Sequence, residues 1–223
     1  MNMISIAIDG PAGAGKSTIS KRVAAELGFV YVDTGALYRT VGYSLISNNI
    51  SVKDAASVKK HLTEIKVDMQ NNNGVQRVIL NGKDVSDSIR TPEVSMAASD
   101  CSALACVRSF LLDIQREMAE THNVVMDGRD IGTVVLPNAD IKIFLTAAPE
   151  ERAKRRFDEL ILKNPDIKYE DVLNDLIKRD SNDSNREIAP LKPAEDSITV
   201  DTTGNELEES VAQMLKTIKE RLK

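Results

Sequence analysis

The sequence predicts an α/β protein whose parallel sheet has about five strands and is flanked by helices. Short apolar runs alternate with longer segments that repeat apolar residues at helical spacing, which is the pattern of consecutive β–α units. A glycine-rich stretch follows the first apolar run, and alternating polar and apolar residues interrupt the series between residues 50 and 88. We therefore expect one α/β domain with right-handed crossovers and a small antiparallel insertion.

Composition places limits on the class of protein. The chain has 223 residues, of which 42% are hydrophobic and 28% charged, as in ordinary globular proteins with one sizeable core. A net charge of −5 argues against broad binding to nucleic acid or membrane, which needs a basic surface. No apolar stretch approaches membrane-spanning length, and the N-terminus lacks the regions of a signal peptide. We therefore expect a cytoplasmic protein.

The first β–α unit contains a phosphate-binding loop. Residues 3–8 form an apolar run of strand length, and the next residues fit the pattern G-x-x-x-x-G-K-[ST]. The loop consists of Gly10, Pro11, Ala12, Gly13, Ala14, Gly15, Lys16, Ser17 and Thr18. Strand, glycine loop and helix together direct backbone N–H groups at phosphates. We expect Lys16 to neutralise the β- and γ-phosphates and Ser17 to bind Mg²⁺.

The second β–α unit begins with a short buried strand at residues 29–32. Asp33-Thr34-Gly35 follows, and a helix is predicted to run from there to about Ser47. Asp33 or Thr34 is suited to cap this helix. The carboxyl end of a strand beside a phosphate loop is also where ligands bind in open α/β sheets. Both roles stay open, because a cap can also hold a phosphate.

Residues 50–88 have the pattern of an inserted antiparallel unit. A polar helix is predicted at 54–63, followed by the alternating residues Ile65, Val67 and Met69. A turn is expected at 71–74, and Asn81-Gly82 predicts a tight hairpin. We assign about 50–91 to an inserted subdomain. It either decorates the fold or covers the acceptor substrate.

The middle of the chain is predicted to return to the main sheet. A helical pattern runs from Pro92 to about Glu120, with a break near Ser102, and strands are expected at 124–126 and 141–146. The first of these strands ends in Asp127-Gly128-Arg129-Asp130. A carboxylate at this place, Asp127, is expected to act on Mg²⁺ directly or through water.

The last third opens with a charged helix from Pro149. Its charge run is typical of a solvated face, but Arg152, Arg155 and Arg156 also suit a lid over phosphates, expected at about 150–189. A polar helix is predicted at 169–178, and residues 179–186 have the composition of a hydrophilic loop. A strand at 197–201 and a helix at 206–223 complete the prediction. The core of the domain is then about 1–48, 92–148 and 190–223.

Phosphate loops serve switches, motors and kinases, so the loop alone leaves the reaction open. The chain lacks an Asn-Lys-x-Asp guanine-binding motif and is short for a motor, which favours a small-molecule kinase. A hydroxyl acceptor benefits from a base that removes its proton. A phosphate acceptor instead needs its negative charge offset, because two unit charges 4 Å apart repel by roughly 4 kcal/mol at an effective dielectric of 20. Candidate arginines are Arg39, Arg129, Arg155, Arg156, Arg179 and Arg186. We therefore expect a phosphate acceptor.

Six segments together resemble bacterial cytidylate kinase. They are Ile8-Asp9-Gly10-Pro11, residues 33–39, residues 127–133, Arg179-Asp180-x-x-Asp183-Ser184-x-Arg186, residues 190–194 and residues 201–204. The match extends almost from end to end and includes the insertion. The resemblance implies a nucleoside monophosphate kinase of the P-loop fold, a monomer that transfers the γ-phosphate of ATP to CMP or dCMP with Mg²⁺.

The resemblance also implies roles for single residues. Gly10 to Thr18 would bind ATP, and Lys16, Arg129 and Arg186 would be catalytic. The CMP site would comprise Thr34 and the phosphate-binding Arg39, Arg129 and Arg186, with Ser99, Arg108 and Asp130 at cytosine and Arg179 and Asp183 at the ribose. Arg155 and Arg156 would belong to the lid. A carboxylate facing cytosine N4 and an arginine facing N3 and O2 match the base.

One departure and two alternatives accompany this prediction. Ala105 stands where the family is expected to have a proline, which puts the position of Arg108 in doubt. The nearest alternative is a P-loop kinase with another acceptor, such as UMP, shikimate or the coenzyme A precursor. The second is a nucleotide-binding regulatory module that transfers no phosphate.

Overall fold

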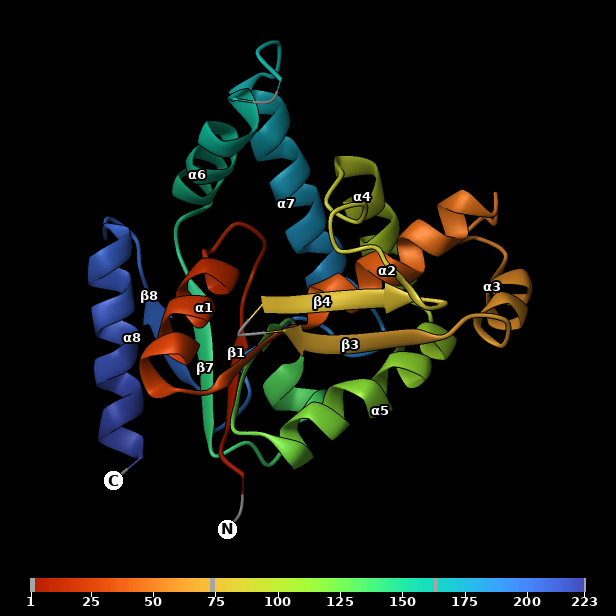
Figure 1. Ribbon diagram of the computed structural model, residues 1–223. Helices are drawn as coiled ribbons and strands as arrows, with labels where there is room; N and C mark the ends of the chain where they lie inside the picture. Colours follow the sequence, from red (N-terminus) through yellow and green to blue (C-terminus); the bar gives the residue numbers. More distant parts are fainter. Residues whose placement is uncertain (1–2, 73–74, 163, 223) are drawn as a thin grey trace.

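The computed structural model describes residues 3–72, 75–162 and 164–222 (Figure 1). The main sheet consists of β1 (Ser5–Asp9), β2 (Val30–Asp33), β6 (Val124–Gly128), β7 (Ile141–Thr146) and β8 (Ile198–Asp201). The helices are α1 (Lys16–Leu27), α2 (Thr34–Ser47), α3 (Ala55–Leu62), α4 (Pro92–Cys101), α5 (Ala105–Thr121), α6 (Pro149–Ile161), α7 (Tyr169–Asn185) and α8 (Leu207–Arg221). A π-helical turn, η1 (Ile131–Val135), follows β6.

The main sheet has the strand order β2-β6-β1-β7-β8, and every neighbouring pair is parallel. β1 therefore lies in the centre, and the carboxyl ends of β2, β6 and β1 meet at the same edge of the sheet. This architecture confirms the predicted α/β fold with a parallel sheet of five strands.

Helices cover both faces of the sheet and form two hydrophobic layers (Figure 1). On β1, Ile6 and Ile8 face the layer that holds α1 and α8, whereas Ala7 faces the layer that holds α2 and α5. All three side chains are fully buried. A central parallel strand buried on both faces reads as a continuous apolar run, which is why residues 3–8 were recognisable as a strand.

The insertion forms a separate antiparallel sheet of β3 (Val67–Asn72), β4 (Val75–Leu80) and β5 (Lys83–Asp84). Asn81 and Gly82 both have positive φ, 50° and 82°, as the predicted tight hairpin requires. Val67, Met69 and Val78 are buried in the same cluster as α2 and α5. The turn expected at 71–74 lies partly outside the described residues. The sheet thus shares the core of the domain on one face.

The predicted break in the long helical segment is confirmed. α4 ends at Cys101 with Ser102 as its C-cap, α5 begins after Leu104, and the axes of the two helices are bent by 102°. In the described part of the chain no single helix is long and apolar enough to cross a membrane. Taken together, the bent pair of α4 and α5 would be long and apolar enough by length and composition alone. Its apolar residues Val94, Cys101, Val107 and Leu111 pack in the core.

The prediction of a hydrophilic loop at residues 179–186 was wrong. α7 continues from Tyr169 to Asn185, so this segment is helical except for its last residue. Asp, Ser and Asn have low helix propensity, which is why the sequence favoured a loop. The helix is held by tertiary ion pairs, because Asp180 and Asp183 bind arginines of two other segments.

Gly42 marks a close approach of α2 to α4. A Cβ at this position would lie 2.9 Å from the backbone nitrogen of Ala98 and 3.2 Å from the carbonyl carbon of Ala97. We predict that Gly42→Ala lowers the free energy of unfolding by about 1–3 kcal/mol, because overpacking outweighs the gain of about 1 kcal/mol in helix propensity.

Urea unfolding measures this change. Ser47→Ala, at the exposed end of the same helix, is the matched control and is expected to shift stability by no more than about 0.5 kcal/mol. A Gly42→Ala protein more stable than the parent would contradict the close approach.

Candidate active site

Three loops meet at the carboxyl edge of the sheet. The phosphate loop follows β1, the Asp33–Thr34 segment follows β2, and residues 127–130 lie at the end of β6. The strand registers pair Asp9 with Gly128 and Asp33 with Asp127, so the three loops lie side by side. This is the edge at which open parallel sheets bind their ligands.

The phosphate loop has the geometry its glycines predict. A Cβ on Gly10 would lie 2.0 Å from the carbonyl oxygen of Leu145, so only glycine fits. Gly15 has φ 81° and precedes α1, whose first residues are Lys16 and Ser17. Lys16 Nζ donates to the Pro11 carbonyl at 2.7 Å. Burial and the nearby Arg129 guanidinium lower the pKa of Lys16, so an anion bound beside it would favour the ammonium form.

Asp127 joins the phosphate loop to the neighbouring strands. Ser17 Oγ donates to Asp127 Oδ2 at 2.8 Å, and Tyr31 donates its hydroxyl to Asp127 Oδ1 at 3.1 Å. Thr34 Oγ1 donates to the Asp127 carbonyl at 2.8 Å. Burial raises the pKa of Asp127, and the Asp33 carboxylate raises it further. A buried carboxylate in contact with a hydroxyl offers the hard oxygen ligands that Mg²⁺ prefers.

The donor set fits Mg²⁺ held together with a nucleotide. Within residues 3–72, 75–162 and 164–222, no group of three His, Cys, Asp or Glu side chains gathers around one point. A protein-only cage is therefore not formed by the described side chains. Mg²⁺ in nucleotide sites is commonly bound by one or two protein oxygens, phosphates and water. Ser17 and Asp127 satisfy that requirement.

Asp9 ties the acceptor side of the site to the phosphate loop. Its carboxylate accepts hydrogen bonds from the backbone nitrogens of Ile131 and Gly132, at 2.7 and 2.8 Å. Burial raises the pKa of Asp9 to about 6, although the two amide bonds favour the charged form. The sequence prediction included Asp9 only as part of a motif. Its carboxylate fixes the turn that directly follows Arg129 and Asp130.

Arginines and carboxylates alternate across the acceptor side of the site. Arg129 Nε donates to Asp183 Oδ2 at 2.8 Å, and Arg186 Nη1 lies 3.9 Å from Asp183 Oδ1. Arg186 Nη2 donates to Asp130 Oδ1 at 3.4 Å, and Arg108 forms an ion pair with Asp130 Oδ2. Five residues that are separated by up to 78 positions in the sequence are thereby brought into one network.

The positive charges in this network exceed what its carboxylates neutralise. Burial and neighbouring arginines lower the pKa of both Arg179 and Arg186. The Nε atoms of Arg39 and Arg179 are buried without a hydrogen-bond partner among the described residues. Arg39 Nη2 is held by Asp33 at 2.7 Å. Mutually destabilised guanidinium groups with unused donors form a site prepared for an anion.

Asp130 and Arg108 lie together in a buried position. Arg108 Nη1 also donates to the Ser102 carbonyl at 3.1 Å, and its guanidinium lies 5.6 Å from the centre of the Tyr38 ring. Ser99 enters this network through its carbonyl, which accepts a hydrogen bond from Ser102 Oγ at 2.7 Å. The sequence prediction missed the contacts of Ser102 with Arg108 and Arg186.

Ala105 does not displace Arg108 from Asp130. It is the first residue of α5, a position where proline is common because the missing N–H has no partner within the helix. Alanine also starts a helix readily. The ion pair between Arg108 and Asp130 is therefore formed without the expected proline.

The base of the α6–α7 hairpin is attached directly to the phosphate loop. Arg152 Nη1 donates to the Ala12 carbonyl at 2.8 Å and to Asp180 Oδ2 at 2.6 Å. The Ala12 N–H in turn donates to Asp180 Oδ1 at 3.1 Å. In the sequence, Arg152 belongs to a charge run that also suits a lid, and Asp180 enters only as part of a motif. Their contact depends on two helices meeting, which no local pattern reports.

The two arginines assigned to the lid have different surroundings. Arg155 donates to the Thr202 carbonyl at 3.1 Å and lies beside Gly15. Arg156 pairs with Glu159 at 3.0 Å, and 40% of its side chain is exposed. Arg155 is therefore next to the phosphate loop, while Arg156 is at the surface.

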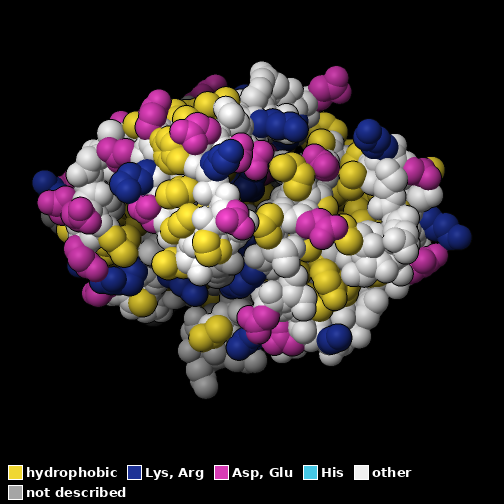
Figure 2. All heavy atoms as spheres, turned by 90° about the horizontal axis from the view of Figure 1, so that it is seen from above, with side chains coloured by type: hydrophobic (Ala, Val, Ile, Leu, Met, Phe, Trp, Pro, Cys, Tyr) yellow, Lys and Arg dark blue, Asp and Glu magenta, His cyan; other side chains and the backbone are white. Residues whose placement is uncertain are grey.

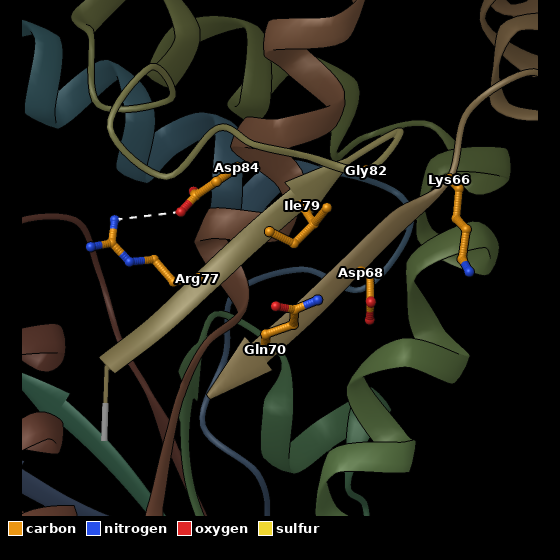
Figure 3. Close-up of a pocket in the computed structure, with 7 residues that line it drawn as sticks. All are labelled: Lys66, Asp68, Gln70, Arg77, Ile79, Gly82 and Asp84. Carbon is orange, nitrogen blue, oxygen red and sulfur yellow. Dashed lines mark ion pairs between the residues drawn. The ribbon is translucent and has the colours of Figure 1, made fainter. Parts of the chain in front are cut away.

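A polar hollow also lies on the surface outside the candidate active site. The face seen from above intersperses Lys and Arg with Asp and Glu side chains (Figure 2). A polar hollow lies on the outer face of the β3–β5 sheet, with Arg77 paired to Asp84 at 3.6 Å (Figure 3). None of its lining residues belongs to the phosphate loop or to the arginine network.

Comparison of the sequence with a family model and with curated proteins gives the same family in each case. The model of the family described as cytidylate kinase matches residues 6–220. Cytidylate kinase of Caldicellulosiruptor bescii is 52% identical over 216 residues, 97% of this chain and 96% of the relative. That of Carboxydothermus hydrogenoformans is 49% identical over 213 residues, 96% of each chain. An uncharacterised protein of Eubacterium ventriosum shares the fold, with a TM-score of 0.52 at 14% identity over 98% of this chain and 100% of that protein.

The contact of Arg152 with the phosphate loop yields a prediction. Arg152→Met removes three hydrogen bonds and leaves the Asp180 carboxylate without its arginine. We expect a loss of about 3 kcal/mol in the free energy of unfolding, because breaking a buried pair leaves an uncompensated charge. The KM for ATP is expected to rise about tenfold, because the Ala12 segment loses its support.

The matched control is Lys154→Met, on the exposed face of the same helix, where the ion pair with Asp158 contributes little. Urea unfolding and initial rates at varied ATP measure both effects. Equal behaviour of the two variants would show that the hairpin does not support the loop.

Proposed function

The chain belongs to the cytidylate kinase family, and we propose on that premise that it transfers the γ-phosphate of ATP to CMP or dCMP through the arginine network described above. The products are ADP and CDP or dCDP. The single observation that carries the role of the network is the group of three arginines, Arg108, Arg129 and Arg186, that share only two carboxylates, Asp130 and Asp183. Such a group is stabilised by a phosphate, which neither a hydroxyl acceptor nor a purely regulatory module requires.

The donor side of the reaction is formed by the phosphate loop. Residues 10–18 bind ATP, with the N–H groups at the start of α1 and the Lys16 ammonium directed at its phosphates. Mg²⁺ would be held by Ser17, with Asp127 acting directly or through water. When bound, it offsets charge on the phosphate oxygens. Lys16 then adds the fixed positive charge that the donor needs as its leaving group develops.

The acceptor side neutralises a second anion. Arg39, Arg129 and Arg186 bind the CMP phosphate, which is mostly dianionic at neutral pH and needs no base to remove a proton. Ion pairs with Asp33 and Asp183 hold two of these guanidinium planes in place before substrate binds. Guanidinium groups held in fixed positions lower the free-energy cost of aligning the phosphate of CMP with the γ-phosphate of ATP. Transfer is direct, without a phosphoenzyme.

The remaining residues select the nucleoside. Asp130 accepts from cytosine N4, Arg108 donates to N3 and O2, and Ser99 lies beside them. Arg179 and Asp183 bind the ribose. Asp130 forms an ion pair with an arginine on each carboxylate oxygen, and a carboxylate can only accept hydrogen bonds. A base that presents an oxygen at position 4 therefore places two acceptors against each other, with no hydrogen bond between them.

We further propose that three parts of the chain divide the work of binding and transfer. The main sheet is the core, about 50–91 forms the nucleoside monophosphate subdomain, and about 150–189 forms the lid with Arg155 and Arg156. Closure of the lid would exclude water, which otherwise competes as acceptor. We further propose a monomer that acts in the cytoplasm, where ATP and CMP are available.

Discrimination between CMP and UMP tests the role of Asp130. We expect kcat/KM for CMP to exceed that for UMP at least about tenfold, because an unpaired buried polar group costs about 1–3 kcal/mol. Asp130→Asn can donate to uracil O4, so the ratio should fall towards one. The assay is ADP production with ATP, Mg²⁺ and each acceptor in turn.

Asp68→Asn serves as the matched control, because Asp68 lies on the outer face of the β3–β5 sheet (Figure 3). It should keep the preference of the parent protein. Equal turnover of CMP and UMP by the unaltered protein would remove Asp130 from cytosine recognition.

A further inference from the structure

We infer that Gln76 is a positioning residue for the acceptor phosphate, acting through Asp33 on Arg39. The inference rests on the proposed function, because it assigns Arg39 to the CMP phosphate. Gln76 lies on β4 of the insertion, outside every motif that the sequence singled out.

The side chain of Gln76 forms a reciprocal pair with one peptide unit of the main sheet. Its Oε1 accepts from the Asp33 N–H at 2.7 Å, and its Nε2 donates to the Asp33 carbonyl at 3.1 Å. Asp33 is the last residue of β2, the edge strand of the parallel sheet. The amide group of Gln76 thus occupies the place that a further strand would take, and it satisfies both backbone groups of Asp33.

Asp33 uses its carboxylate for two other contacts. Oδ1 accepts from the Ala36 N–H at 3.0 Å and caps α2, and Oδ2 holds Arg39 Nη2 at 2.7 Å. The backbone position of Asp33 therefore determines where the Arg39 guanidinium stands. Because Gln76 fixes that backbone from the outer side, its effect reaches Arg39 through one residue.

The rest of β4 keeps Gln76 on the correct side. Val78, two residues further, is buried in the core, whereas Arg77 and Ile79 line the hollow on the outer face (Figure 3). Alternation along the strand places Gln76 on the same side as Val78. The insertion is thereby connected to the acceptor side of the site by a specific pair of hydrogen bonds in addition to apolar packing.

This arrangement predicts a selective kinetic effect. Gln76→Met keeps the length and volume of the side chain and removes both hydrogen bonds. The KM for CMP should rise about tenfold, because two backbone groups lose their partners and Arg39 loses its fixed support. The KM for ATP should stay within about twofold, since both hydrogen bonds of Gln76 go to Asp33 on the acceptor side of the site. The factor for dCMP should equal that for CMP, because the phosphate is common to both.

The matched control is Gln70→Met, which changes the same residue type on the outer face of the neighbouring strand (Figure 3). It should leave both KM values unchanged. Gln76→Asn retains the amide but is one methylene shorter, so it should show the same selective rise in KM for CMP. Gln76→Asn therefore tests the positioning role of Gln76 if the Gln76→Met protein does not fold.

A double-mutant cycle separates positioning from a general structural role. If Gln76 acts through Arg39, adding Gln76→Met to Arg39→Met should change kcat/KM for CMP by no more than about twofold. Multiplication of the two single effects would overturn the inference, as would equal KM values for CMP in the Gln76 variants and the parent. Failure of the parent protein to phosphorylate CMP would instead overturn the proposed function, so the two failures are distinguishable.

Discussion

The structure depends on the confinement of like charges at one edge of a parallel sheet. Lys16 is buried there beside partly buried arginines of three separate segments, and burial together with neighbouring cations lowers the pKa values of Lys16, Arg179 and Arg186. Burying charged groups is costly unless each has partners. Asp183 and Asp130 supply part of this compensation, and each binds two arginines. In the proposed function, the phosphate of the acceptor supplies the remainder of this compensation.

Several side chains bind main-chain groups and thereby hold the loops at this edge of the sheet in position. Asp9 binds the turn after β6, Arg152 and Asp180 bind the backbone of Ala12 in the phosphate loop, and the side chain of Gln76 binds the end of β2. Each contact joins segments distant in the sequence and ends on a main-chain group rather than on another flexible side chain. Main-chain attachment gives the arginines fixed positions, which phosphoryl transfer needs more than it needs chemical groups.

The sequence predicted the parallel sheet, the hairpin at Asn81-Gly82 and the break between α4 and α5, because each has a local signal of periodicity or turn chemistry. The family model and the relatives confirm the recognition of the family. The helical course of residues 179–185 was missed, because ion pairs formed across the fold outweigh the low propensity of Asp, Ser and Asn. The contacts of four residues had no local signal in the sequence, because they join separate elements of the fold: Arg152, Asp180, Ser102 and Gln76. The individual roles of the predicted site residues stay predictions.

Comparison of CMP with cytidine in a calorimetric titration tests the central claim most directly, because the two ligands differ only in the phosphate. If the buried arginines are arranged for that group, CMP should bind at least about 100-fold more tightly than cytidine at physiological salt, since each hydrogen bond to a charged group contributes about 1.5–3 kcal/mol. Equal affinity of the two ligands would contradict the account, because the arginine network would then have no part in holding the acceptor.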